Sequence, residues 1–184
     1  PGYAFVPQPN AVAQAVLAAS SWAVLALICD IELFSQAHYR SSIDPETRID
    51  PLWKDVFLFH WKEESQHAIL DELEWRREDA SLSLQERDAA VDDLVALVGA
   101  VGATVTQQSY ADSTYFFDLC LRELSAEERV AVRESMLRAY RWQYILSGAQ
   151  DERFLSILGD LVSEEQKARI GAALAPIAQA ARLS

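Results

Sequence analysis

The sequence predicts an all-α protein: an antiparallel bundle of four long helices followed by a short extra C-terminal helix. The 184 residues are 51% hydrophobic but include only 6 Gly and 6 Pro, which is too few for a loop-rich or all-β chain. Apolar residues recur at helical spacing, and no strand-like alternation extends beyond a few residues. A chain of this length is expected to fold as a single domain, residues 1–184, around one core.

The first helix is expected over about residues 11–40. Asn10 follows Pro9 and is a candidate cap for its first turn. The segment is apolar around most of its circumference, so we expect cover on more than one side, from the C-terminal helix or from a second subunit. Asp30 and Glu32 lie within it, and because charges inside a bilayer are costly, a buried core helix is favoured over a membrane span.

Each later helix begins at a capping signal. A cap followed by proline at the first helical position opens one helix, and Ser-x-x-Glu or Ser-x-x-Gln boxes open the other three. The capping residues are Asp50, Ser83 with Glu86, Ser125 with Glu128, and Ser163 with Gln166. The helices are expected over about residues 51–78, 84–123, 126–147 and 164–180, with a short extra turn at ERFLSIL.

Composition and charge exclude several function classes. The net charge is −12 and the pI about 4.6, whereas nucleic acid and anionic membranes need a basic surface, so neither is expected as a partner. Cys29 and Cys120 both lie in apolar helical contexts, which favours buried thiols and a reducing cytoplasm. The chain has no phosphate-binding glycine loop, no cysteine spacing typical of zinc sites, and no recognisable nucleophile motif.

The inward seam of each long helix changes from apolar to polar partway along. If all four seams face the core, a polar layer crosses the bundle. Buried carboxylates in such a layer are unfavourable unless charges or hydrogen bonds compensate, and a metal ion is the usual compensation. A fully hydrogen-bonded polar seam is the alternative, and the residues alone leave both open.

The segment FHWKEESQHAIL, residues 59–70, carries the candidate site. His60, Glu64 and His67 fall at i, i+4 and i+7, which places them on one face of a helix. Glu64 and His67 form a Glu-x-x-His pair one turn apart. Glu32 lies on the inward seam of the preceding antiparallel helix, at an offset that lets it meet Glu64 at the same level.

These residues resemble the ferritin-like di-iron carboxylate superfamily, whose four-helix bundles hold metal with single Glu residues and Glu-x-x-His pairs. The resemblance covers the four long helices. It implies that Glu32 is the lone carboxylate of the first helix, that Glu64 bridges, and that His67 is a terminal ligand. It also implies an iron cofactor, mono- or dinuclear, with manganese as an alternative.

The second half departs from that pattern. Where the family has a Glu and a second Glu-x-x-His pair, this chain has Gln108 and Tyr140-Arg-Trp-Gln143. Asp112, one turn after Gln108, could replace the missing carboxylate. The resemblance therefore implies an intact first metal position and an altered second one, with Tyr140 as a catalytic residue near the open coordination face.

His60 is the remaining candidate ligand. Seven residues separate it from His67, roughly 10 Å along the helix axis, so the two histidines cannot readily share one ion. His60 is expected either to serve a second ion with Glu64 or Asp112, or to donate a hydrogen bond to a carboxylate.

Three functions remain open from the sequence. The first is an oxidoreductase that uses O₂ and a non-haem iron or di-iron site to oxidise a small-molecule substrate. The second is iron handling, as a ferroxidase or storage protein. The third is a non-catalytic binding or interaction module with a degraded metal site. A homodimer is the expected assembly.

Overall fold

The fold is all-α, as the sequence predicts. The computed structural model describes residues 3 and 5–182, which form helices and their connecting segments, with no strand among them. Within this described part, the segments η1 and η2 have π-helical turns. In chain order the elements are α1 (Pro9–Leu17), α2 (Ser21–His38), η1 (Tyr39–Ile43), α3 (Pro51–Ser81), α4 (Leu84–Leu119), α5 (Ala126–Arg141), η2 (Trp142–Leu146), α6 (Ser147–Ala149), α7 (Glu152–Leu161) and α8 (Glu164–Arg182).

The predicted caps are confirmed from Asp50 onward. The Asp50 carboxylate accepts a hydrogen bond from the Leu52 N–H at 2.8 Å, which caps α3. Capping boxes with both reciprocal hydrogen bonds open α4 and α5. The same pair of bonds joins Ser163 and Gln166 at the start of α8. Each cap stabilises its helix because backbone groups in the first turn lack a helical partner.

The prediction of one helix over residues 11–40 is wrong, because the chain bends at Ser20 and forms two helices, α1 and α2. Ser20 has extended backbone angles, and its N–H donates to Oδ2 of Asp93 in α4 at 2.8 Å. Local periodicity could not reveal this bend, since the contact joins residues far apart in sequence. The cap residue of α1 is Gln8, so the predicted cap at Asn10 is also wrong.

The other differences lie mainly at helix C-termini. α4 ends at Leu119 instead of 123, because the backbone becomes extended at Cys120. The helix predicted over 126–147 is α-helical only to Arg141 and continues through η2 into α6. The expected short turn at ERFLSIL is a ten-residue helix, α7. The C-terminal helix is longer than predicted: α8 has 19 residues. It packs along α4.

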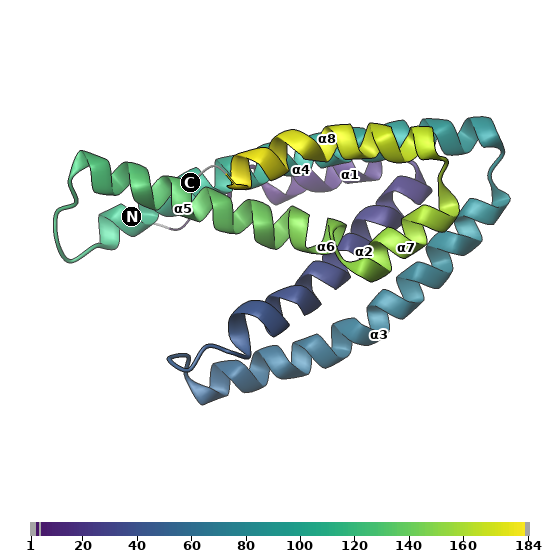
Figure 1. Ribbon diagram of the computed structural model, residues 1–184. Coiled ribbons are helices and arrows are strands. Elements are labelled where there is room, and N and C mark those ends of the chain that lie inside the picture. The colour runs from purple at the N-terminus through teal and green to yellow at the C-terminus, as the bar shows by residue number, and fades with distance from the viewer. Residues whose placement is uncertain (1–2, 4, 183–184) are drawn as a thin grey trace.

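Two antiparallel helix pairs frame the molecule (Figure 1): α2 with α3, and α4 with α5. α8 runs along α4 in the same direction, with Arg169 at Asp88 and Ile177 at Gly102. α2 also packs against α4, η2 and α6, so it joins the two pairs. Away from this junction the two pairs diverge, as Figure 1 shows.

The main apolar core lies at the junction. Trp22 of α2 and Trp75 of α3 are fully buried, with ring centroids 5.2 Å apart, and Phe154 of α7 lies 5.6 Å from Trp75. Burial of such large rings dominates the apolar stabilisation of a small core. Glu32 lies further along α2, next to Leu33, which is the residue of this buried core on α2 farthest from Trp22 in sequence.

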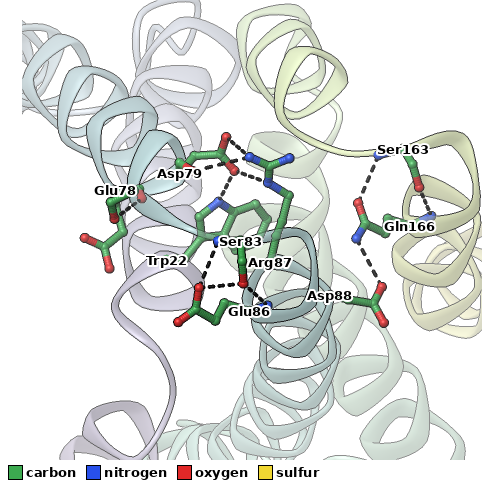
Figure 2. A network of polar contacts seen from close by, with 10 residues as sticks. Trp22, Glu78, Asp79, Ser83, Glu86, Arg87, Asp88, Ser163 and Gln166 are labelled. Carbon is green, nitrogen blue, oxygen red and sulfur yellow. Dashed lines mark hydrogen bonds and ion pairs between the residues drawn. The ribbon is translucent and has the colours of Figure 1, made fainter.

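A buried polar network closes the corner beside this core (Figure 2). The Asp79 carboxylate accepts hydrogen bonds from Nε1 of Trp22 at 2.9 Å and from Nε and Nη2 of Arg87 at 2.6 and 2.7 Å. On the other side of α4, Asp88 accepts a hydrogen bond from Nε2 of Gln166 at 3.1 Å. These contacts tie α2, α3, α4 and α8 together.

Among the residues that the structure describes, one helix, α4, is long and apolar enough to cross a membrane. It contains an 18-residue window with a mean hydropathy of 1.6, of which 28% is buried within the fold. It packs against α2, α5, η2 and α8. The earlier apolar segment, now α1 and α2, does not meet these two criteria.

Candidate metal centre and adjoining pocket

Glu32, Glu64 and His67 converge between α2 and α3. One possible ligand atom from each residue lies within 4.8 Å of the other two. Nδ1 of His67 is 2.9 Å from Oε2 of Glu64 and 4.0 Å from Oε2 of Glu32. The three meet because α2 and α3 are antiparallel, and because Glu64 and His67 are one turn apart on the same face of α3.

The cluster is buried on its carboxylate side and open on its imidazole side. The side chains of Glu32 and Glu64 are 14% and 13% exposed, whereas that of His67 is 49% exposed. A cation could therefore reach the cluster from solvent and be held by oxygens that are largely shielded from water. Shielding strengthens the attraction between a cation and these carboxylates.

The neighbouring carboxyl groups of Glu32 and Glu64 shift each other's pKa in opposite directions. Burial and the neighbouring Glu64 carboxylate raise the pKa of Glu32 to about 8. Contacts with Glu32 and with the two histidines lower the pKa of Glu64. Carboxylates this close do not readily ionise together, so Glu32 holds the proton. Oε2 of Glu32 is buried and accepts no hydrogen bond from a permanent donor, and the proton that Glu32 holds is shared with Glu64. A bound cation would displace that proton.

Gln36 and Ser65 align the two helices at this level. Nε2 of the buried Gln36 donates to the backbone carbonyls of Glu32 at 3.3 Å and of Glu64 at 3.5 Å. Oγ of Ser65 lies 3.4 Å from Oε1 of Gln36. These bridges hold the backbones of both carboxylates, which places their side chains opposite one another.

His60 lies one turn before Glu64. Its Nδ1 is 3.0 Å from Oε1 of Glu64, while His67 contacts the other oxygen of the same carboxylate. The side chain of His60 is 50% exposed. The two histidines thus flank Glu64 from opposite turns of α3, and in this position His60 can orient the carboxylate by hydrogen bonding.

Asp112 and Tyr140 belong to a second polar cluster, between α4 and α5. Tyr140 donates a short hydrogen bond from its hydroxyl to Oδ2 of Asp112. Oδ1 of Asp112 accepts a hydrogen bond from Nε2 of Gln108 at 2.8 Å. Burial and the Asp112 carboxylate raise the pKa of Tyr140. Asp112 is not in the group of described residues whose ligand atoms converge with Glu32.

A cavity of about 460 Å³, here called the aromatic pocket, lies between these two clusters. One wall comes from α2, η1 and α3, and the other from α5 and η2. His60 and Tyr140, one residue from each polar cluster, lie on opposite walls. The lining residues are Phe34, Ser35, His38, Tyr39, Ser42, Phe57, His60, Trp61, Ala139, Tyr140, Trp142, Gln143 and Tyr144.

Sequence reasoning missed several residues around the site. Asp71 lies one turn beyond His67, and its Oδ2 is buried without a hydrogen-bond partner, while burial raises its pKa. His38 and Trp61 line the aromatic pocket, although no spacing pattern singled them out. Clustering of aromatic residues on both sides of the η1 segment was the available signal.

No protein-family model, curated protein or solved structure matches this chain.

Proposed function

We propose that Glu32, Glu64 and His67 bind one divalent metal ion and that the protein is an O₂-dependent oxidoreductase acting on a small molecule. The observation that carries the proposal is the convergence of three ligand atoms from two helices within 4.8 Å, next to a buried and unpartnered carboxylate oxygen. Without metal, the proton that Glu32 shares with Glu64 pairs the two carboxyl groups, and a bound cation would take the place of that proton.

The donor set favours iron or manganese. Two carboxylates and one imidazole suit these hard ions better than Cu(I) or structural zinc, which favour thiolates. A mononuclear site is favoured over a dinuclear one, because both oxygens of Asp112 already accept hydrogen bonds from Gln108 and Tyr140. Bound iron would supply O₂ activation, which side chains alone cannot provide.

The chain's own residues would divide the remaining tasks. His60 would orient Glu64 through the contact at 3.0 Å. Tyr140, whose hydroxyl is held by Asp112, would line the pocket opposite His60 and contact the substrate there.

A ferritin-like origin of this arrangement is part of the proposal. The α2–α3 and α4–α5 pairs would correspond to the two hairpins of that architecture, with the metal position kept in the first hairpin. Support comes from Glu32 and the Glu64–His67 pair meeting across the first hairpin. In the second hairpin, Gln108, Asp112 and Tyr140 form a hydrogen-bonded cluster instead.

Metal content and thermal stability test the proposal. We expect about one equivalent of Fe(II) or Mn(II) per chain and, at saturating metal, a rise in Tm of about 5–10 °C, since a ligand that binds only the folded state stabilises it. Glu32→Gln and His67→Ala should abolish both effects. Glu63→Gln changes an exposed neighbour on α3 and is the matched control, which should keep both.

The same experiment separates the alternatives. Two equivalents, with one lost in Asp112→Asn, would indicate a dinuclear centre. If the folded wild-type chain binds no metal and its Tm does not shift, the metal assignment is contradicted and a non-catalytic binding module is favoured. Metal binding with O₂ consumption would support the oxidoreductase, whereas a cage-sized assembly by light scattering would support iron storage.

A further inference from the structure

We propose that the aromatic pocket binds an uncharged, ring-containing small molecule that carries both a hydrogen-bond donor and an acceptor. The pocket's volume of about 460 Å³ falls within the range typical of small-molecule sites, roughly 300–1,000 Å³. Four observations define the ligand class: the lining rings, the buried polar atoms without partners, the absence of charge, and the helical irregularities at the pocket edges.

Aromatic side chains form both walls. On one wall Tyr39 and Trp61 stack with their centroids 5.3 Å apart, and Phe57 lies on the same side. On the other, Tyr140 and Tyr144 contact edge to face at 5.3 Å. Rings on two facing walls favour a flat ligand, because stacked and edge-to-face contacts add stabilisation beyond simple burial.

Three polar atoms of lining residues are buried without hydrogen-bond partners: Nε1 of Trp61, Nδ1 of His38 and Oε1 of Gln143. The Trp61 nitrogen can only donate, and the Gln143 oxygen can only accept. Buried polar groups are rarely left unpaired, because each costs free energy when it loses water. Both atoms are shielded from the cavity as the side chains now lie, so a ligand with one acceptor and one donor would pair with them once the Trp61 and Gln143 side chains turn toward it.

The pocket carries no fixed charge. Its lining includes no Lys, Arg, Asp or Glu, so an anion would find no counter-charge there. A cation would find only ring faces, because the nearby carboxylates of Asp112 and Glu64 are already paired with Tyr140 and His60. The net charge of −12 further disfavours anions. An anion would therefore lose its hydration without compensation and a cation with only partial compensation, which favours an uncharged ligand.

Both π-helical segments contribute to the pocket. Tyr39 and Ser42 come from η1, and Trp142, Gln143 and Tyr144 come from η2. π-Helical turns are uncommon and occur frequently at functional sites. Here they face each other across one cavity, which is expected for irregularities that shape a binding site.

The pocket adjoins the proposed metal centre through His60, which lines the pocket and contacts Glu64 at 3.0 Å. Binding of the ring requires only the pocket. Identifying that ring as the substrate rests on the proposed function, and the experiment below keeps the two claims apart.

Calorimetric titration of the full chain in the presence of a chelator tests the binding claim. The probe is para-(hydroxymethyl)benzamide, which has a ring, a donor and an acceptor and is uncharged. We expect saturable binding with one site per chain. The carboxylate analogue, para-(hydroxymethyl)benzoate, and the non-aromatic cyclohexane analogue of the amide should each bind at least about fivefold more weakly.

Variants place the probe in this pocket. Trp61→Phe keeps the ring and removes the donor, and Gln143→Leu removes the acceptor; each should weaken binding by about 3- to 10-fold. Trp53→Phe and Gln107→Leu change exposed residues outside the pocket and should leave affinity unchanged. No saturable binding, or equal affinity in all four folded variants, would overturn the proposal.

The chelator and a sedimentation measurement separate the competing explanations. Because the titration contains a chelator, saturable binding of the probe does not depend on metal, so loss of the metal assignment would leave the pocket assignment standing. Sedimentation should show no change of mass on adding the probe. A dimer that the probe dissociates, or that excludes it, would mean that a second chain fills the pocket and would overturn the proposal.

Discussion

Asp79 is the residue on which the corner between α2, α3 and α4 most depends. It is buried, and its carboxylate holds the Trp22 indole N–H and the Arg87 guanidinium at 2.6–2.9 Å. Asp79→Ala should lower the free energy of unfolding by about 3–5 kcal/mol, because it leaves a largely buried cation and an indole N–H unpaired. Urea unfolding followed by circular dichroism measures this loss.

The control for that prediction is Arg48→Gln. Arg48 also forms an ion pair, with Glu46 at 2.9 Å, but its side chain is 87% exposed. Exposed pairs contribute little because water and salt screen them, so the unfolding midpoint should not change measurably. Equal losses in the two variants would show that the Asp79 network is no more important than a surface pair.

The two cysteines should differ in reactivity. Cys29 is fully buried, and burial, with nearby Asp71, raises the pKa of its thiol to about 12. The reactive thiolate is therefore a minor species at neutral pH, and it forms only as the pH approaches that value. Cys120 is partly exposed. Mass spectrometry after iodoacetamide treatment should show one adduct on the native chain, at Cys120, and two after denaturation. Rapid native labelling of Cys29 would contradict the burial.

At the scale of elements, the close packing of α6 on α2 can be tested at Gly148. A Cβ added at Gly148 would overlap the backbone carbonyl of Asp30 and lie 2.5 Å from its Oδ1. Gly148→Ala should therefore cost about 3 kcal/mol of stability, since a helix backbone cannot move away cheaply. Differential scanning calorimetry of the variant measures the loss.

Gly99 is the matched comparison, because it is also helical but has nothing within 4 Å of an added Cβ. Gly99→Ala should raise the free energy of unfolding by about 0.5–1 kcal/mol through helix propensity alone. Opposite signs for the two Gly→Ala changes would locate the α2–α6 contact. A stabilising Gly148→Ala would mean that α6 does not pack as closely as the structure has it.

The starts of the elements were more predictable than their ends. Asp50 before Pro51, and the Ser83–Glu86 box, are local sequence features, so the caps they predict form as expected. The bend at Ser20 depends on Asp93 of another helix, and no nearby residue encodes it. Helix ends such as Leu119 lack a comparable signal, so their positions were missed by a few residues.

For the whole molecule, the strongest expectation concerns charge. With 28 acidic against 16 basic residues, the folded chain carries a net charge of −12 and repels itself. Raising NaCl from low to physiological concentration should increase Tm by a few degrees, because salt screens this repulsion. A chelator must be present so that trace metal does not bind the Glu32–Glu64–His67 cluster. A fall in Tm would mean that favourable ion pairs outweigh the net repulsion.

The candidate site shows how far sequence reasoning reaches at this scale. Helical spacing put Glu64 and His67 on one face, and antiparallel pairing brought Glu32 to the same level, because both follow from helix geometry. Asp112 was grouped with them as a possible ligand. Instead it accepts hydrogen bonds from Gln108 and Tyr140, a pairing that depends on how α4 meets α5.

The sequence by itself determined the all-α class, most helix starts and the shared face of Glu64 and His67, because these depend on interactions within a few residues along the chain. Only the tertiary structure decided how the two helix pairs diverge, where α7 and α8 pack, and that His60 and Tyr140 lie on opposite walls of one aromatic pocket. These features arise from contacts between residues distant in sequence, and a periodic pattern along one helix carries no information about the angle at which another helix meets it.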